Sequence, residues 1–278
     1  MRVSVVQMCP GQDKAANLAE AGRLVAAAVE EERPDLVALP ELWTCLGGDA
    51  ATKRAAAEPL PAPGANAPAG PAYQFLQDAA RRHRIHLHGG SIGEAQDGRL
   101  YNTTLVFDPA GREIARYRKI HLFDITTPDG TGYRESATYG AGEAVVTCAV
   151  NGIRMGCAIC YDLRFPELFL ALRRAGAELI VLPAAFTLAT GRDHWEPLLR
   201  ARAIETQCWF AAPATWGSHA AADGSPRLTY GHSLIVDPWG QVVASVADGT
   251  GFAGARIDPA RTARIRADMP VLDHRKLA

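Results

Sequence analysis

The spacing of apolar residues in the first part of the chain predicts strands that alternate with helices. Arg2–Met8 is rich in valine and alternates, which indicates a strand, and Asp13–Glu31 has helical periodicity with Asp13 as its N-cap. Asp35–Pro40 is a short apolar run that ends in Leu-Pro and is typical of a buried strand. Further along, the pattern predicts a helix at 73–84 and strands at 86–94, 100–107 and 113–118.

The same order of elements recurs in the second half of the chain. Ile153–Cys160 has a strand pattern, Phe165–Ala175 has a helical pattern, and Glu178–Pro183 closely resembles Asp35–Pro40. After these, a helix is predicted at 194–206 and strands at 209–212, 230–236, 241–246 and 251–257. The recurrence indicates two related βαβ halves. Because no linker separates them, we predict one α/β domain over residues 1–278, a β-sandwich covered by helices.

Turn and loop signals separate these elements. Asp108-Pro-Ala-Gly111 and Asp237-Pro-Trp-Gly240 are hairpin turns between predicted strands. Pro59–Pro71 is rich in proline, glycine and alanine and predicts a surface loop. Lys119–Glu143 has no clear periodicity, and a loop of this length inside a compact domain is usually either functional or disordered.

Composition and charge narrow the class of partner. With 48% apolar residues and a net charge of −1 over 278 residues, the chain is typical of a globular protein and lacks the electrostatic signature of nucleic-acid or membrane binding. The N-terminal apolar run is too short for a signal sequence, and no run is long enough to span a membrane. The six cysteines are scattered, which argues against a disulfide framework. We therefore expect a cytoplasmic protein with a small-molecule partner.

Three reactive residues stand where predicted strands end. Glu41 follows Asp35–Pro40, Lys119 follows the strand at 113–118, and Cys160 ends the strand that begins at Ile153. Ligands gather at the carboxyl ends of strands in open α/β sheets, and a cysteine at a strand-to-helix junction is exposed for attack. Taken singly, each has an ordinary structural explanation, namely a buried thiol, a solvated carboxylate and a basic surface run. Their matching positions favour a shared catalytic role.

The repeat itself supports this interpretation. The second Leu-Pro strand end carries Ala184 where the first carries Glu41, so the acid is not required by the fold pattern.

Cys157 and Cys160 form a C-x-x-C spacing, but Cys157 lies inside an apolar strand, and residues three apart on a strand face opposite sides. We therefore expect Cys157 to belong to the core, and we expect no metal and no cofactor.

Three motifs, in this order along the chain, resemble the nitrilase superfamily of carbon–nitrogen hydrolases: Leu39-Pro-Glu41, Tyr117–Phe123 and Cys160–Glu167. The stretches Thr190–Cys208 and Tyr230–Gly240 are most similar to its Nit branch, which includes omega-amidases and deaminated-glutathione amidases. The resemblance covers nearly the whole chain. It implies a four-layer α-β-β-α sandwich with pseudo-two-fold internal symmetry, which usually pairs with a second copy as a homodimer.

The resemblance also implies the roles of the site residues. The Glu-Lys-Cys triad of the superfamily corresponds to Glu41, Lys119 and Cys160. A second glutamate that follows the lysine corresponds to Glu135 in Arg134-Glu-Ser136, with Glu143 as a rival whose motif matches less well.

The chemistry needs a nucleophile, a proton shuttle and an oxyanion partner. Cys160 attacks the carbonyl, Glu41 carries the proton, and Lys119 with the Tyr161 backbone N–H holds the oxyanion. For the substrate, Arg164 lies one helical turn beyond Cys160, within reach of a carboxylate, although pairing with a neighbouring acid is equally compatible with the sequence. Phe186 and Thr190 occupy positions that line the pocket in related amidases.

The leading hypothesis is a cysteine-dependent amidase that converts a small carboxylate-bearing amide to an acid and ammonia through a thioester. Deaminated glutathione and the omega-amide of a 2-oxo acid are the substrates that the resemblance favours. An N-carbamoyl hydrolase or a nitrilase with the same triad is the alternative within the superfamily. The alternative from another class is a non-catalytic interaction protein, or a thiol or metal protein built on Cys157 and Cys160.

Overall fold

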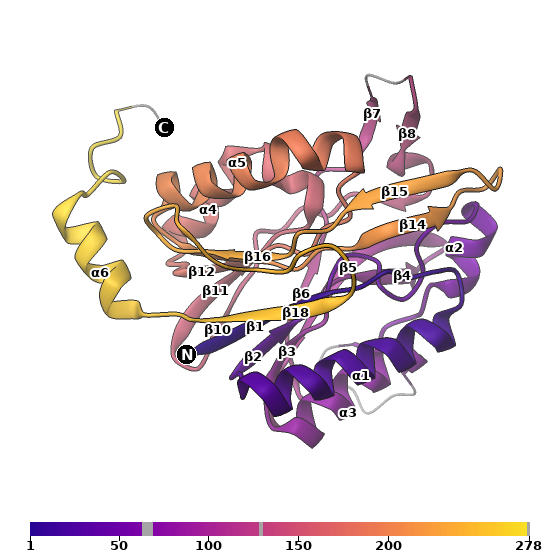
Figure 1. Ribbon diagram of the computed structural model, residues 1–278, viewed down its shortest axis with the longest axis horizontal. Coiled ribbons are helices and arrows are strands. Elements are labelled where there is room, and N and C mark those ends of the chain that lie inside the picture. Colours follow the sequence, from indigo (N-terminus) through magenta and orange to yellow (C-terminus); the bar gives the residue numbers. More distant parts are fainter. Residues whose placement is uncertain (63–68, 128–129, 277–278) are drawn as a thin grey trace.

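Two β-sheets form the centre of the molecule in the computed structural model, which describes residues 1–62, 69–127 and 130–276. In Figure 1 the sheets lie face to face, with α1 and α3 on one outer side and α4 and α5 on the other. The helices are α1 (Lys14–Glu32), α2 (Ala50–Ala56), α3 (Pro71–His83), α4 (Pro166–Arg174), α5 (Leu188–Thr206) and α6 (Pro259–Asp268).

The first sheet has the strand order β18-β1-β2-β3-β5-β4, and β6 and β9 also pair with β5. Its strands are β1 (Arg2–Gln7), β2 (Leu36–Ala38), β3 (His86–His88), β4 (Ile92–Gln96), β5 (Arg99–Phe107), β6 (Glu113–Arg118), β9 (Tyr139–Gly140) and β18 (Gly251–Arg256). The second sheet has the order β10-β11-β12-β13-β16-β17. Its strands are β10 (Thr147–Val150), β11 (Ile153–Cys157), β12 (Leu179–Val181), β13 (Trp209–Ala212), β16 (Leu234–Val236) and β17 (Val242–Ser245).

The two halves of the chain have the same topology, as the recurring pattern indicates. β1, β2 and β3 run parallel, and β5 and β6 then follow as antiparallel neighbours. β11, β12, β13, β16 and β17 repeat this order and these directions. Both predicted hairpin turns join the last two strands of their half. In each turn the aspartate, Asp108 or Asp237, accepts two backbone N–H bonds of 2.9 Å.

Burial on both faces explains why the central strands are continuous apolar runs rather than alternating ones. In β2 and the residue after it, Leu36 and Ala38 belong to the core between the sheets, whereas Val37 and Leu39 belong to the core under α1 and α3. The inter-sheet core also takes in the inner side chains of α4 and α5, such as Phe169 and Trp195. The layers are therefore α1/α3, first sheet, second sheet and α4/α5.

Several predicted boundaries were wrong. The strand predicted at 86–94 is two strands, because the chain turns at Gly90, whose φ is +58° and where a Cβ would meet the Pro40 carbonyl oxygen at 2.0 Å. The strand that we extended to Cys160 ends at Cys157. The strand predicted at 230–236 is also divided: β16 starts at Leu234, and Tyr230 ends an earlier strand.

Several helices and strands of the structure were not predicted, and one helix begins earlier than predicted. α5 begins at Leu188 rather than 194, because Thr187 caps its first turn by accepting the Thr190 N–H at 3.2 Å. α2, α6 and β10 were not predicted, nor was the hairpin of β14 (Trp216–Ala220) and β15 (Pro226–Tyr230). The long loop after Lys119 contains a small hairpin, β7 (Asp124–Thr126) with β8 (Gly132–Arg134), and the short 3-10 helix η1 (Glu135–Ala137).

Two further expectations concern loops and membranes. The middle of the loop predicted at Pro59–Pro71, residues 63–68, lies outside the described residues. Within the described part of the chain, every helix is too short or too polar to cross a membrane.

Candidate active site

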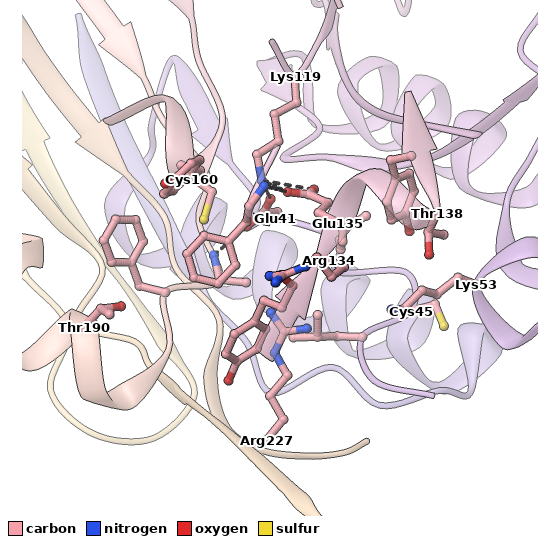
Figure 2. Close-up of a pocket in the computed structure, with 18 residues that line it drawn as sticks. Glu41, Cys45, Lys53, Lys119, Arg134, Glu135, Thr138, Cys160, Thr190 and Arg227 are labelled. Atoms are coloured by element: carbon pink, nitrogen blue, oxygen red, sulfur yellow. Dashed lines mark hydrogen bonds and ion pairs between the residues drawn. The ribbon is translucent and has the colours of Figure 1, made fainter. Parts of the chain in front are cut away.

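Glu41, Lys119 and Cys160 converge at one end of the sandwich, although they come from three different strand exits. Glu41 follows β2 and Lys119 directly follows β6, and these two strands run in the same direction in the first sheet. Cys160 follows β11 of the second sheet and opens the 3-10 helix η2 (Cys160–Arg164). Figure 2 shows the Lys119 side chain pointing at both carboxylates, with the Cys160 sulfur beside Glu41. The site is therefore assembled between the two sheets.

The Lys119 ammonium lies between two carboxylates. Its Nζ donates to Glu41 Oε1 at 3.0 Å and to Glu135 Oε2 and Oε1 at 2.8 and 3.1 Å. The lysine is almost fully buried. Burial alone would lower the pKa of Lys119, but the charges of Glu135 and Glu41 outweigh it and raise the pKa well above its usual value. Lys119 is therefore a fixed cation held between the two glutamates.

Further donors hold the two carboxylates in place. Asn102 Nδ2 donates to Glu41 Oε1 at 2.8 Å and to Glu135 Oε1 at 3.2 Å. The Ala185 N–H donates to Glu41 Oε2 at 2.8 Å, and the Phe123 N–H donates to Glu135 Oε2 at 2.7 Å. Glu41 thus has a different donor on each oxygen, which fixes the plane of its carboxylate next to Cys160.

The backbone at Cys160 is held in the left-handed region, with φ of +47°. This conformation is costly for a non-glycine residue and persists only when the surroundings enforce it. Here the Cys160 N–H donates to the Pro183 carbonyl at 2.9 Å, and the preceding Ile159 N–H donates to the Asp162 carboxylate at 2.8 Å. The following N–H, that of Tyr161, lies in the first turn of η2, where backbone donors have no partner within the helix.

Asp162 ties this turn to the segment that carries Lys119. It is fully buried, and its carboxylate accepts the Tyr117 hydroxyl at 2.6 Å and the His121 backbone N–H at 3.1 Å. The His121 ring Nδ1 lies 2.7 Å from the same carboxylate. Because Tyr117 and His121 flank Lys119 in the chain, one carboxylate fixes both the turn at Cys160 and the segment that carries the lysine.

The Cys160 thiol is protonated in this environment. Burial raises its pKa well above the usual value, and the neighbouring Glu41 charge and a hydrogen bond to Glu41 raise it further, while Lys119 opposes them. The Glu41 carboxylate beside the thiol is the group placed to take its proton (Figure 2). The geometry therefore suits a base that removes the proton as the sulfur attacks, rather than a thiolate that exists beforehand.

The triad opens into a cavity of about 100 Å³. Cys160, Tyr161, Phe186 and Thr190 line one part of it, and Lys119, Glu41 and Glu135 line another. The remaining lining includes three cations that the sequence did not single out, Lys53, Arg134 and Arg227. A pocket of this size, lined by apolar and charged side chains, can hold a small polar ligand next to Cys160.

A carbon–nitrogen hydrolase family model matches residues 2–267 of the chain. The chain belongs to the carbon–nitrogen hydrolase family. Among its relatives, a deaminated glutathione amidase of Synechocystis sp. is 40% identical over 98% of this chain and 97% of its own length. Omega-amidase NIT2 of Mus musculus is 36% identical over 99% of this chain and 95% of its own length.

A solved structure of a relative has the same fold as this chain. Nit3 of Saccharomyces cerevisiae, described as a member of branch 10 of the nitrilase superfamily, is 32% identical and superposes with a TM-score of 0.87. The match covers 100% of this chain and 97% of that chain. The nitrilase-like sandwich that the motifs implied is confirmed, and the protein is an enzyme that hydrolyses carbon–nitrogen bonds.

The structure distinguishes the candidate site residues in two cases where the sequence left alternatives open. Glu135 contacts Lys119, whereas its rival Glu143 is exposed. Tyr161, Phe186 and Thr190 line the cavity, but Arg164 is not part of the lining.

Arg164 packs against the rings of Tyr161 and Phe186, which line the cavity. Its guanidinium lies 5.4 Å from the Phe186 ring centroid and 3.3 Å from His194 Nδ1, and it forms no ion pair with a carboxylate among the described residues. The suggested pairing with a neighbouring acid is therefore not seen. A role for Arg164 in substrate binding remains a prediction.

Two residues that hold the side chains of the hydrolase site in place, Asn102 and Asp162, were not predicted from the sequence. Asn102 is an interior residue of β5, and no motif marks it, although it bonds both glutamates. Asp162 does have a signal, because it stands two residues after the nucleophile in the Cys160–Glu167 motif. Cys157, the centre of the thiol or metal alternative, is fully buried in the core. In the described part of the chain, no three His, Cys, Asp or Glu side chains are grouped to bind a metal.

Proposed function

We propose that the enzyme is a cysteine-dependent amidase that uses Cys160 as nucleophile, Glu41 as general base and acid, and Lys119 as oxyanion partner. The observation that carries this proposal is the arrangement of thiol, carboxylate and ammonium around one small buried cavity, with Lys119 Nζ 3.0 Å from Glu41 Oε1. Membership of the carbon–nitrogen hydrolase family supports it.

In the first half-reaction the Cys160 sulfur attacks the amide carbonyl carbon while Glu41 takes the thiol proton. The oxyanion forms beside the Lys119 ammonium and the Tyr161 N–H, which are already in position and require little reorganisation. Glu41 then gives the proton to the leaving nitrogen, the carbon–nitrogen bond breaks, and ammonia or an amine departs. A thioester remains on Cys160.

In the second half-reaction water attacks the thioester. Glu41 takes a proton from the water and returns it to the departing Cys160 sulfur, so that the acid product and the free thiol are formed. Glu135 has no step of its own in this scheme; it holds Lys119 in place with two contacts of 2.8 and 3.1 Å. The sum is one amide and one water converted to one acid and one amine.

For the substrate, we propose a small amide that carries a carboxylate, the class to which deaminated glutathione and the omega-amides of 2-oxo acids belong. Relatives at 40% and 36% identity are named deaminated glutathione amidase and omega-amidase. The cations in the lining, Lys53, Arg134 and Arg227, support a negatively charged substrate. Their position favours them over Arg164 as partners of the carboxylate.

The homodimer and the cytoplasmic setting belong to the same proposal. An apolar groove lined by Ile204, Trp239 and Met269, which are 53%, 51% and 41% exposed, supports a second copy that covers it. All six cysteines, which lie within the described residues, are free thiols, in keeping with a reducing compartment.

The test is release of ammonia or amine from a panel of amides, with the wild type and Cys160→Ala compared at equal concentration. We expect turnover by the wild type on carboxylate-bearing amides and a fall of at least about a thousandfold in Cys160→Ala, since the covalent route is removed. Full activity in the variant, or no turnover of any amide by the wild type, would reject the amidase.

A further inference from the structure

One of the two carboxylate oxygens of Glu41 already has all the hydrogen bonds it can accept. An ionised carboxylate oxygen has two lone pairs, and Glu41 Oε1 accepts from Lys119 Nζ at 3.0 Å and from Asn102 Nδ2 at 2.8 Å. Among the nitrogen donors of the described residues, only the Ala185 N–H bonds the other oxygen, Oε2, at 2.8 Å. One lone pair of Oε2 therefore stays free, and a proton can be added there without breaking a contact.

Oε2 is also the carboxylate oxygen on the side of Cys160. Burial and the Glu41 charge raise the pKa of the Cys160 thiol, whereas Lys119 and a hydrogen bond from the Ala185 backbone N–H lower it. Because the same N–H bonds Glu41 Oε2 and acts on the sulfur, these two atoms lie on one side of the carboxylate. Figure 2 shows Glu41 between the Cys160 sulfur and Glu135. The oxygen with the free lone pair is thus the one beside the thiol.

The side chain of Asn102 bridges the two glutamates. Its Nδ2 donates to Glu135 Oε1 at 3.2 Å as well as to Glu41 Oε1. Lys119 Nζ donates to the same two oxygens. The opposite orientation of the amide would place its oxygen against two carboxylates, so the contacts fix which end is the donor. Asn102 therefore supplies donors to a buried pair of carboxylates without adding a charge.

The backbone of Asn102 is held independently of this side chain. The residue is fully buried in β5 and pairs with Gly93 of β4, and its carbonyl oxygen accepts the Lys119 N–H at 2.9 Å. Asn102 does not line the cavity at Cys160, so it is not placed to touch a substrate. Any effect of its amide on the reaction must therefore pass through the two glutamates.

We propose that Asn102 is a positioning residue that directs the Cys160 proton to Oε2 of Glu41 by occupying Oε1. This rests on the proposed amidase function. As the sulfur attacks, the S–H bond breaks and an O–H bond forms at Oε2, and the same oxygen then gives the proton to the leaving nitrogen. Without the Asn102 amide, Oε1 has a free lone pair and the carboxylate can turn. Glu41 keeps its charge but loses its fixed alignment with the sulfur.

The first test is Asn102→Leu, which has a similar size but no donor, on an amide that the wild type hydrolyses. We expect kcat to fall at least about tenfold, part of the ~10²- to 10⁴-fold contribution of a general base. KM should change less than about threefold, because Asn102 does not line the cavity. Iodoacetamide labelling at Cys160 should stay within about threefold of the wild-type rate, because the Glu41 charge remains.

The second test is Asn102→Asp, which keeps the shape of the side chain but donates only when it is protonated. The charged groups around the new carboxyl are Glu41, Glu135 and Lys119, and the Tyr139 phenol lies near the same glutamates. Burial and the two glutamates favour the protonated form, and Lys119 opposes them. The ratio of the variant kcat to the wild-type kcat should therefore rise as the pH falls from about 8 to 5. For Asn102→Leu, which adds no titrating group, the ratio should stay flat.

Thr103→Val is the matched control. Thr103 is the next residue along β5 and is equally buried, but its hydroxyl bonds Glu94 at 2.7 Å and neither glutamate of the site. Its kcat should equal that of the wild type, and thermal unfolding checks that each variant is folded. If Asn102→Leu does not fold, the pH dependence of Asn102→Asp decides alone.

Three results would overturn the role of Asn102: a folded Asn102→Leu protein with the kcat of the wild type, an equal loss of kcat in Thr103→Val, or an Asn102→Asp ratio that does not change with pH. No turnover of any amide by the wild type would reject the amidase and, with it, this role. Normal turnover by the wild type and by both Asn102 variants would reject the role alone.

Discussion

Replacing Glu41 by glutamine separates two effects that this carboxylate has on Cys160. In the proposed mechanism it accepts the thiol proton as a base, and as a negative charge it holds that proton on the sulfur by raising the thiol pKa. Glutamine has nearly the same shape but neither property. We therefore expect Glu41→Gln to make Cys160 a worse catalyst and, at the same time, a more reactive thiol toward a simple alkylating reagent.

The size of the second effect follows from the charge that is removed. Two unit charges about 4 Å apart, a typical separation within hydrogen-bond reach, interact by about 4 kcal/mol at an effective dielectric constant of about 20. About half of this gain is lost, because a thiolate of lower pKa is a weaker nucleophile. The remaining ~2 kcal/mol corresponds to a rise of about 30-fold in the alkylation rate near neutral pH. Turnover should fall by about 10²- to 10⁴-fold, the usual contribution of a general base.

The assay is the second-order rate of iodoacetamide labelling at pH 7, followed by mass spectrometry of the peptide that contains Cys160. Peptide-level detection is necessary because Cys9 is exposed and will react as well. Folding is checked by thermal unfolding. The side-chain amide introduced by Glu41→Gln would keep the contacts of one oxygen with Lys119 and Asn102, but it would place an N–H₂ against the Ala185 N–H, at a cost of about 1–3 kcal/mol.

Glu143→Gln is the control, because Glu143 is exposed and does not line the cavity at Cys160. It should leave labelling and turnover as in the wild type. If a folded Glu41→Gln protein is labelled at Cys160 as slowly as the wild type or more slowly, Glu41 does not hold the thiol proton, and the assignment of the base is wrong.

Two further residues give predictions on stability. Asp162→Asn replaces one of the two buried oxygens that accept the Tyr117 hydroxyl, the Ile159 N–H and the His121 N–H by an N–H₂ group that faces these donors, so we expect a loss of about 3 kcal/mol in urea unfolding. Its kcat should fall more than its KM changes, and a purely structural role would leave kcat per folded molecule unaltered. His88 is fully buried and its pKa is lowered to about 3 from 6.5 by burial, so the unfolded chain binds the proton first and stability falls as the pH drops from about 6.5 toward 3. Neither His88 ring nitrogen bonds another described residue, so His88→Leu should not destabilise at pH 7 and should flatten this dependence, measured by urea unfolding from pH 7 to 4; an unaltered slope would contradict it.

Comparison of the predicted and observed bounds of individual elements shows which features of the fold are encoded locally in the sequence. The pattern predicted β6 and β13 at their observed bounds, and Asp13 caps α1 with bonds of 2.9 and 3.1 Å as expected. Periodicity and caps act over a few residues, so they are visible in the chain itself. The start of α5 was missed because its first turn contains Gly191, a poor helix former, which packs where a Cβ would meet Tyr230 at 2.3 Å.

The residues of the site also fall into two groups, those that the local sequence marks and those that it does not. Glu41, Lys119 and Cys160 could be found because each follows a recognisable strand, and motifs gave their order. Asn102 and the cations Lys53 and Arg227 could not, because nothing in their own neighbourhood of the sequence marks them. Their contribution depends on which chain segments the fold brings against the cavity.

By itself, then, the sequence determined the central strands of both sheets and the repeat of two halves, and it singled out the residues of the proposed chemistry, since these follow from local spacing and motifs. Only the tertiary structure decided that Lys119 meets a carboxylate 78 residues away, that Asp162 ties the turn at Cys160 to the lysine segment, and that Arg164 is not part of the cavity lining. Such contacts arise when two sheets pack their buried faces together. The free energy of that packing comes from the whole core, so no single segment of the sequence reveals it.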